Sequence, residues 1–231
     1  MEYYMMYYLT GFIILPVYIF ALICQAKVKS NFNKYSGIMS RSGMTGADAA
    51  WRLLQLNGIT DVKIQRIGGT LTDYYDPSKK VICLSSDVFD SKSIAAIGVA
   101  CHEAGHAVQH AQGYFPLKIR NVVIPATRIG SSLGIPLCLI GLFINSTYLA
   151  YFGLILYGFV ALFQLITLPV EFNASSRALN TIETYGFLTS EEYAGAKKVL
   201  TAAALTYVAA LASALATLLR LILVINGGRR R

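Results

Sequence analysis

The sequence predicts a mainly α integral membrane protein with about four transmembrane helices and a small α+β module that contains a β hairpin. Two features of the composition predict this class. Of the 231 residues, 55% are hydrophobic and only 14% are charged, whereas a soluble domain carries roughly 25% charged residues. The apolar residues also lie in long blocks instead of recurring at the short periods of a soluble core. Lipid is therefore the expected solvent for much of the chain.

Four blocks are long enough to cross a bilayer, which requires roughly 20 apolar residues. They cover residues 3–24, 122–145, 148–170 and 202–225. The last block contains Arg220, which can reach the membrane surface or face a polar cavity. Each block is a predicted transmembrane helix.

The first block is predicted to be a retained anchor. It follows Glu2 instead of a basic region, and its positive charges, Lys27, Lys29 and Lys34, come after it. The positive-inside rule then places the segment between blocks one and two in the cytoplasm. The three arginines 229–231 favour the opposite orientation, because four crossings bring that end to the outer side.

The net charge of +8 raises the question of nucleic acid. The basic residues flank the apolar blocks, so anionic lipid headgroups explain them and no nucleic acid partner is expected. The four cysteines form no C-x-x-C pair. Neither a disulfide framework nor a thiolate metal site is therefore predicted.

A folded polar module is predicted within residues 27–121. Residues 45–57 have helical spacing behind a possible Thr45 cap. Residues 62–67, 71–75 and 81–84 have strand character and are separated by Gly68-Gly69 and by the turn residues 76–79, which gives a hairpin. One long helix follows at 93–112. The predicted divisions are an anchor (1–26), the module (27–121), a helical membrane hairpin (122–170), a polar helical segment (171–201), and a last membrane helix with a basic tail (202–231).

The long helix carries the sequence His102-Glu103-Ala104-Gly105-His106, which matches H-E-x-x-H. Residues four apart lie on one face of a helix, so both imidazoles can bind one metal ion. Zinc held by two histidines needs a third protein ligand and one position open for water. Glu103 is the expected general base that takes the proton of a zinc-bound water. The motif therefore predicts one Zn²⁺ per chain and peptide hydrolysis, although imidazole and carboxylate ligands also suit manganese or cobalt.

The third ligand is expected to be Glu171, which directly follows the third apolar block and begins a polar cluster. Asp73, Asp76 and Glu183 are alternatives. His110 continues the four-residue spacing, but it lies about 12 Å from His102 along a helix axis, so we expect a polar or supporting role for it.

Several segments resemble the YugP-like bacterial membrane zinc metallopeptidases. They are residues 71–77 (LTDYYDP), 81–86 (VICLSS), 93–109 (SIAAIGVACHEAGHAVQ) and 169–175 (PVEFNAS). The chain is more distantly similar to HtpX and the CAAX prenyl endopeptidases, gluzincins whose third zinc ligand is the glutamate of E-x-x-A-D. The resemblance thus implies a zincin-like module, a multi-pass protein of the bacterial plasma membrane, and Glu171 as a zinc ligand.

Two further assignments concern Ser175 and Arg177, which follow Glu171. Ser175 stands where the distant relatives have aspartate, so a hydroxyl can replace the carboxylate that holds a ligand histidine. Arg177 resembles an arginine of these relatives, and it can stabilise the oxyanion, pair with Glu171, or form a structural surface contact.

An extended peptide substrate can pair with a strand made of Val81, Ile82, Cys83, Leu84 and Ser85, although the same residues can form an ordinary buried strand. Unfolded or membrane-associated proteins are the expected substrates. The alternative function is a non-catalytic membrane zinc-binding or scaffold protein, for which Glu103 would be unnecessary. The oligomeric state is not predicted.

Overall fold

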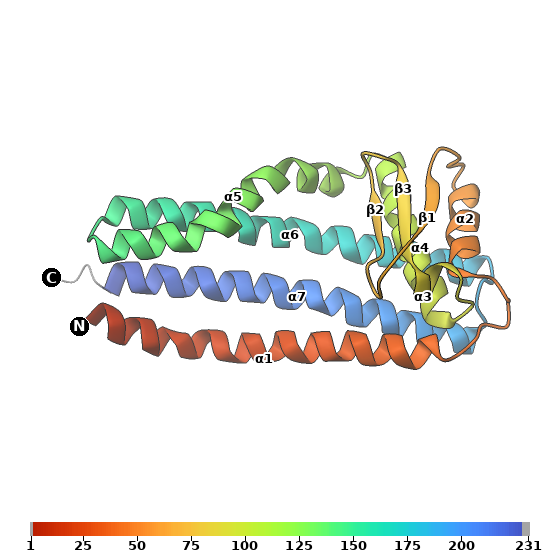
Figure 1. Ribbon diagram of the computed structural model, residues 1–231, viewed down its shortest axis with the longest axis horizontal. Helices are drawn as coiled ribbons and strands as arrows, with labels where there is room; N and C mark the ends of the chain where they lie inside the picture. Colours follow the sequence, from red (N-terminus) through yellow and green to blue (C-terminus); the bar gives the residue numbers. More distant parts are fainter. Residues whose placement is uncertain (1, 228–231) are drawn as a thin grey trace. The chain divides into compact units, whose positions relative to one another are not determined.

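The computed structural model describes residues 2–227, with side chains from residue 10 onward. The described chain contains seven helices and three strands in the order α1 (Glu2–Ser36), α2 (Gly46–Leu56), β1 (Lys63–Ile67), β2 (Tyr74–Asp76), β3 (Val81–Ser85), α3 (Ser86–Phe89), α4 (Ile94–Ala111), α5 (Phe115–Phe143), α6 (Thr147–Thr184) and α7 (Ser190–Gly227) (Figure 1). The mainly α class with a small sheet is confirmed. The basic tail 229–231 lies outside the described residues.

The chain divides into two units that each contain several separate segments. The first unit comprises residues 1–24, 118–169 and 206–231, and the second comprises residues 25–117 and 170–205. Each of the long helices α1, α5, α6 and α7 therefore contributes residues to both units. The polar module of the second unit includes the far ends of α6 and α7, which the predicted divisions treated as a segment of their own.

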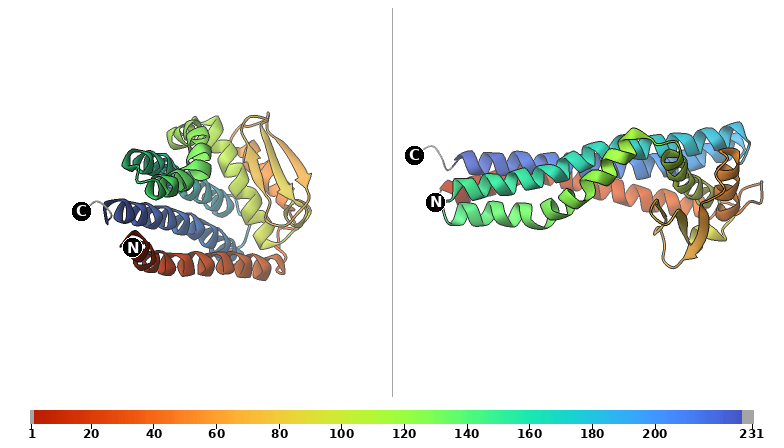
Figure 2. Two further views of the ribbon diagram at one scale, coloured as in Figure 1. Left: turned by 60° about the vertical axis from the view of Figure 1, so that its left-hand side comes forward. Right: turned by 90° about the horizontal axis from the view of Figure 1, so that it is seen from above.

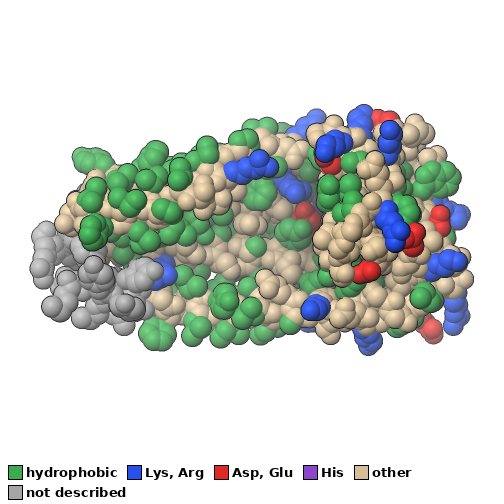
Figure 3. Space-filling view, in the orientation of Figure 1, with side chains coloured by type: hydrophobic (Ala, Val, Ile, Leu, Met, Phe, Trp, Pro, Cys, Tyr) green, Lys and Arg blue, Asp and Glu red, His purple; other side chains and the backbone are tan. Residues whose placement is uncertain are grey.

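The first unit is apolar. Its described residues include only five charged ones, namely Glu2, Lys118, Arg120, Arg128 and Arg220. Hydrophobic side chains cover most of the visible surface of these helix segments in the space-filling view (Figure 3). Four helices are long and apolar enough to cross a membrane, and they correspond to the four predicted blocks, although α5 ends at Phe143, two residues before the predicted end of the second block. Exposed apolar surface of this extent requires lipid instead of water.

The small sheet of the second unit has the strand order β1-β3-β2. β1 pairs with β3 in parallel, with Lys63 opposite Val81 and Ile67 opposite Ser85. β2 and β3 form the predicted hairpin, with Tyr74 opposite Cys83 and Asp76 opposite Val81. β3 therefore lies in the middle of the sheet, and all five of its residues are buried (Figure 1).

Two helices complete the core of the second unit. α2 begins at the predicted cap, where the Thr45 side chain accepts a hydrogen bond from the Asp48 N–H and the Asp48 carboxylate accepts one from the Thr45 N–H. α4 begins behind Ser93, whose side chain accepts a hydrogen bond from the Ala96 N–H at 3.2 Å. Small and apolar residues of α4 pack against α2 and the sheet (Figure 2). This packing fixes the helix that carries the H-E-x-x-H motif.

Candidate metal centre

The two histidines of the motif lie on α4 with their rings close together. The ring centroids of His102 and His106 are 4.7 Å apart, and the rings meet edge to face. The His102 side chain is 14% exposed and that of His106 is 11% exposed. One helical turn separates the two residues, so their imidazoles point to the same place.

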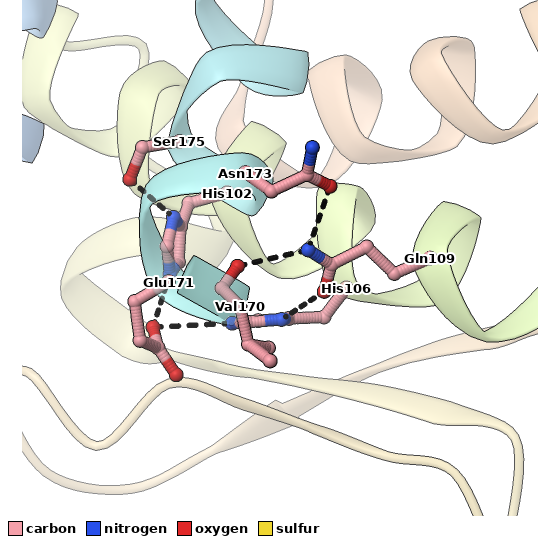
Figure 4. Close-up of polar contacts among 7 residues, drawn as sticks. All are labelled: His102, His106, Gln109, Val170, Glu171, Asn173 and Ser175. Atoms are coloured by element: carbon pink, nitrogen blue, oxygen red, sulfur yellow. Dashed lines mark hydrogen bonds and ion pairs between the residues drawn. The ribbon is translucent and has the colours of Figure 1, made fainter. Parts of the chain in front are cut away.

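Glu171 on α6 supplies the third group. Its Oε2 atom lies 3.3 Å from His102 Nε2 and 3.4 Å from His106 Nε2 (Figure 4). The three ligand atoms lie within 4.8 Å of one another, and no other histidine, cysteine or acidic cluster of this kind occurs where side chains are described, in residues 10–227. The structure therefore brings together the three residues that were expected to hold the metal.

Gly105 explains how α4 and α6 come close enough. A Cβ atom on Gly105 would lie 2.7 Å from the carbonyl oxygen of Ala174. That separation is shorter than a carbon–oxygen van der Waals contact, so any side chain at position 105 would push the two backbones apart. The glycine inside the motif therefore allows the close helix crossing that places Glu171 beside both rings.

The distances fit a tetrahedral metal ion. With metal–ligand bonds of about 2.0–2.2 Å, two ligand atoms at a tetrahedral zinc lie roughly 3.3–3.5 Å apart. The separations of Glu171 Oε2 from the Nε2 atoms of His102 and His106, 3.3 and 3.4 Å, match this value. The donor set of two imidazole nitrogens and one carboxylate oxygen is also one that zinc accepts.

Gln109 determines which nitrogen of His106 carries the proton. The Gln109 Nε2 amide donates to the Val170 carbonyl oxygen at 2.8 Å and to Asn173 Oδ1 at 2.9 Å (Figure 4). Its other atom, Oε1, lies 3.0 Å from His106 Nδ1 and can only accept a hydrogen bond. Neutral His106 is therefore protonated on Nδ1, which leaves a lone pair on Nε2 facing Glu171. Two electron-rich atoms face one another at that point, as metal ligands do.

Ser175 holds the second ring. Its Oγ atom lies 3.1 Å from His102 Nδ1, and Ser175 is buried on α6 one turn beyond Glu171. A hydroxyl oxygen can accept a hydrogen bond from the Nδ1–H group and so direct the His102 Nε2 lone pair toward Glu171. Both imidazoles are thus oriented by side chains other than the metal ligands.

Glu103 lies between the two histidines in sequence and is buried, with 8% of its surface exposed. Burial raises the pKa of the Glu103 carboxyl, while the nearby imidazoles of His102 and His106 act in the opposite direction. A carboxylate with a raised pKa is a better proton acceptor at neutral pH. Its position and environment suit a general base.

Arg177 and His110 lie around the centre. Arg177 donates from Nε to Asn173 Oδ1 and from Nη1 to Gln112 Oε1, both at 2.7 Å, so it connects α6 with the end of α4. His110 Nδ1 lies 2.8 Å from the Tyr75 hydroxyl. Burial raises the pKa of Tyr75 to about 12, so the phenol stays protonated and can donate to this ring. His110 therefore contacts β2 and is not one of the three clustered ligands.

The alternative third ligands lie elsewhere. Asp73 accepts hydrogen bonds from the Ser85 N–H at 2.7 Å and from its hydroxyl. Asp76 is held in its turn by Ser78. Glu183 is exposed and lines a cavity of about 390 Å³ between α6 and α7. None of the three belongs to the ligand cluster of the described chain.

The expectation that a peptide pairs with Val81–Ser85 has to be corrected. β3 is the central strand, with β1 along one side and β2 along the other. β1 pairs with all five residues of β3, whereas β2 pairs with Val81, Ile82 and Cys83, and the Ser85 N–H donates to the Asp73 carboxylate. The strand is buried, as the alternative interpretation expected. A peptide that adds to this sheet would have to use the outer edge of β1 or β2.

Sequence reasoning assigned no role to Gln109, Asn173 or Gly105. A usable signal was present for Gln109, because a residue three positions after His106 lies on the same side of the helix and a ligand histidine needs a partner for its second nitrogen. The contact between Gly105 and Ala174 depends on how two segments far apart in the sequence pack, so no local sequence pattern predicts it.

The fold and the site define a class: a membrane protein with four long apolar helices and a His-His-Glu cluster suited to a divalent metal ion. Comparison with protein families gives the narrower assignment. Residues 10–226 match the family described as "Putative neutral zinc metallopeptidase", and the chain belongs to this family. It is also 48% identical over 205 residues to the "Putative membrane protease YugP" of Bacillus subtilis, covering 89% of this chain and 91% of that protein. No solved structure matches the chain.

Proposed function

We propose that this protein is a zinc-dependent endopeptidase of the gluzincin type that hydrolyses peptide bonds in unfolded or membrane-associated proteins. The observation that carries the proposal is the position of Glu171 Oε2, 3.3 and 3.4 Å from the Nε2 atoms of the two motif histidines. Family membership supports zinc and peptidase chemistry. The presence of Glu103 between the ligands favours an enzyme over a zinc carrier or scaffold, because binding alone needs no base.

His102, His106 and Glu171 would hold one zinc ion, leaving one position open. When bound there, zinc polarises the scissile carbonyl and makes water more acidic. The protein's own contribution is the fixed direction of the two imidazoles, which comes from Gln109 for His106 and from Ser175 for His102. Because these side chains are already held in place, they lose less conformational entropy when the ion binds.

Glu103 would move the protons. It accepts one proton from the attacking water while the oxygen of that water forms a bond to the carbonyl carbon. The same carboxyl would then deliver that proton to the amide nitrogen as the C–N bond breaks, which releases an amine and a carboxylic acid, and the acid loses its remaining proton to solvent. Burial raises the pKa of Glu103, which brings it closer to the pH at which one group can accept and then donate.

The place of Glu171 on α6 bears on the substrate. Residues 147–170 of α6 carry no charged side chain, and Glu171 is the first charged residue after them. The proposed ligand therefore comes at the end of an apolar membrane run, at the level where lipid gives way to water. Lys27, Lys29 and Lys34 follow the first apolar run and favour the cytoplasmic side of the bacterial plasma membrane.

The decisive experiment compares the wild type with Glu103→Gln in detergent, using casein cleavage and metal analysis. We expect the variant to keep its zinc and to lose cleavage by at least about a hundredfold. A His102→Ala/His106→Ala variant should lose both. Equal cleavage by the wild type and Glu103→Gln, at equal zinc content, would reject the mechanism. Zinc without cleavage in the wild type, tested on several unfolded substrates, would favour a zinc-binding protein.

The third ligand has its own test with a matched control. Glu171→Gln removes the charged oxygen near both rings, whereas Glu183→Gln removes an exposed carboxylate farther along the same helix. We expect only Glu171→Gln to lose zinc in a competition with a chelator. Loss of zinc from Glu183→Gln alone would show that the ligand assignment is wrong.

A further inference from the structure

A basic groove lies in the second unit, and none of the three proposed metal ligands lines it. Residues of α1 and α7 enclose a space of about 490 Å³. Three lysines line it: Lys27 on α1, and Lys197 and Lys198 on α7. The two helices lie side by side there, since the Asn31 Nδ2 amide of α1 donates to the Lys198 carbonyl oxygen of α7 at 3.2 Å (Figures 1 and 2).

The lining of this groove is partly polar and partly apolar. Polar groups come from the three lysines, Asn31 and Thr201, whereas Ala194, Ala202 and Leu205 supply apolar surface. The lysines, Asn31 and the threonine offer hydrogen-bond donors, and the lining contains no acidic residue. Such a surface suits a molecule with an anionic head and a hydrocarbon tail.

The charges of the three lysines are not balanced by ion pairs. Among the described side chains, residues 10–227, no carboxylate lies within 4.0 Å of the Nζ atom of Lys27, Lys197 or Lys198. Glu183 lines the neighbouring cavity together with Lys197 but forms no such pair. Three like charges around one groove repel one another, so an anion bound among them would be stabilised.

The sequence places these lysines at the membrane surface on both helices. On α1, Lys27 is the first charged residue after an uncharged run that covers residues 3–26. On α7, Lys197 and Lys198 are the last charged residues before an uncharged run that covers residues 199–219. The groove therefore lies where the apolar parts of both helices begin, at the level of lipid phosphates.

We propose that this groove binds the phosphate headgroup of one anionic phospholipid, with the start of an acyl chain along Ala202 and Leu205. The lysines and the Thr201 hydroxyl donate to the phosphate oxygens. Each lysine near an anionic membrane surface strengthens binding by roughly fivefold, so three together account for on the order of a hundredfold in affinity. The site is independent of the peptidase chemistry.

The test uses the full chain purified in detergent. Phosphatidylglycerol and phosphatidylcholine with identical acyl chains are added separately, and inorganic phosphate is added in a third arm. Bound lipid is counted by native mass spectrometry, and the melting temperature is followed as lipid is titrated. We expect phosphatidylglycerol to bind and stabilise the protein more than phosphatidylcholine, and inorganic phosphate to have little effect.

Two sets of variants distinguish binding in this groove from nonspecific attraction between a basic protein and an anionic lipid. Lys27→Gln/Lys197→Gln/Lys198→Gln should weaken phosphatidylglycerol binding by on the order of a hundredfold. The control Lys29→Gln/Lys63→Gln/Lys92→Gln removes three exposed lysines outside the groove and the same charge, and it should bind like the wild type. If the triple groove variant does not fold, each single groove variant should weaken binding by roughly fivefold.

Three outcomes would overturn the proposal. Equal binding of phosphatidylglycerol and phosphatidylcholine would show that charge is not recognised. Equal weakening in the groove variants and the control would show a nonspecific charge effect. Stabilisation by inorganic phosphate as large as that by phosphatidylglycerol would identify a site for a soluble anion instead of a lipid.

Discussion

Gln109 Oε1 lies 3.0 Å from His106 Nδ1, while the amide nitrogen of the same side chain is held by the Val170 carbonyl and Asn173. These three contacts leave Gln109 one orientation, and through it His106 one tautomer. The link joins α4 to the segment of α6 that carries Glu171. One glutamine thus contacts both the ring of His106 and the backbone beside Glu171, two of the three proposed ligands.

Gln109→Leu is therefore expected to weaken zinc binding by roughly 10–100-fold, the range typical for loss of a residue that orients a ligand histidine. The Val170 carbonyl would also lose a buried hydrogen bond, which costs about 1–3 kcal/mol of stability. Chelator competition measures the affinity, and thermal unfolding measures the stability. Gln65→Leu, on an exposed position of β1, is the control. Wild-type zinc affinity in Gln109→Leu would refute this role.

Ser175 provides a comparison between two substitutions at one position. Ser175→Ala removes the oxygen that lies 3.1 Å from His102 Nδ1, so we expect roughly tenfold weaker zinc binding. Ser175→Asp places a carboxylate there, which accepts the Nδ1 proton more strongly and should restore or exceed the wild-type affinity. The neighbouring Ser176→Ala is the control, since Ser176 is exposed. If Ser175→Ala bound zinc as tightly as the wild type, Ser175 would not be the residue that orients His102.

Gly105 tests whether the helix crossing positions the metal ligand. In Gly105→Ala, the added Cβ meets the Ala174 carbonyl oxygen at 2.7 Å unless the helices separate. We expect a loss of about 1–3 kcal/mol of stability, as for other overpacked contacts, together with weaker zinc binding because Glu171 moves away from the rings.

The matched control for this substitution is Gly158→Ala, since Gly158 is also helical and its added Cβ meets no atom within 4 Å. Thermal unfolding and chelator competition are measured on both variants. A Gly105→Ala protein that melts and binds zinc as Gly158→Ala does would show that the close approach has no role.

The sequence predicted the membrane helices, the Thr45 cap of α2 and the long helix that carries the motif, because each depends on neighbours in the chain. It placed the end of the third membrane block at residue 170, whereas α6 continues to Thr184. An apolar run reports where a helix meets lipid and not where it ends. The helix ends before Gly186, whose positive φ of 64° suits a C-terminal cap.

The order of the sheet was less accessible. Three successive strands suggest a sheet in which each strand pairs with the next one in the sequence. Instead, β3 lies between the other two and pairs in parallel with β1, so β1 and β2 are both edge strands. Strand patterns are local, whereas pairing depends on which faces the helices cover. For the same reason, the role of Val81–Ser85 as a central strand followed only from the structure.

Asp73 shows how the hairpin is held near the site and has a measurable pH dependence. Ser85 donates to it from its backbone N–H at 2.7 Å and from its hydroxyl at 3.1 Å. Burial raises the pKa of the Asp73 carboxyl above 3.8, outweighing the opposite effect of these hydrogen bonds. The folded protein therefore holds this proton more tightly than the unfolded chain does. The resulting stability is fully present below pH 3.8 and is lost as the pH rises through the folded pKa.

Asp73→Asn should remove this loss, because the amide stays neutral and its oxygen can still accept from Ser85. We expect the melting temperature of the variant, relative to the wild type, to rise as the pH increases from below 3.8 to neutrality. Asp61→Asn is a control of opposite sign: the hydrogen bond from Lys80 lowers the pKa of Asp61, so that variant should lose stability relative to the wild type as the pH rises. Thermal unfolding of zinc-free protein at several pH values measures both. Burial raises the pKa of a carboxyl group, whereas pairing with a lysine lowers it. If the melting temperatures of the two variants, relative to the wild type, changed in the same direction with pH, the account of Asp73 would be wrong.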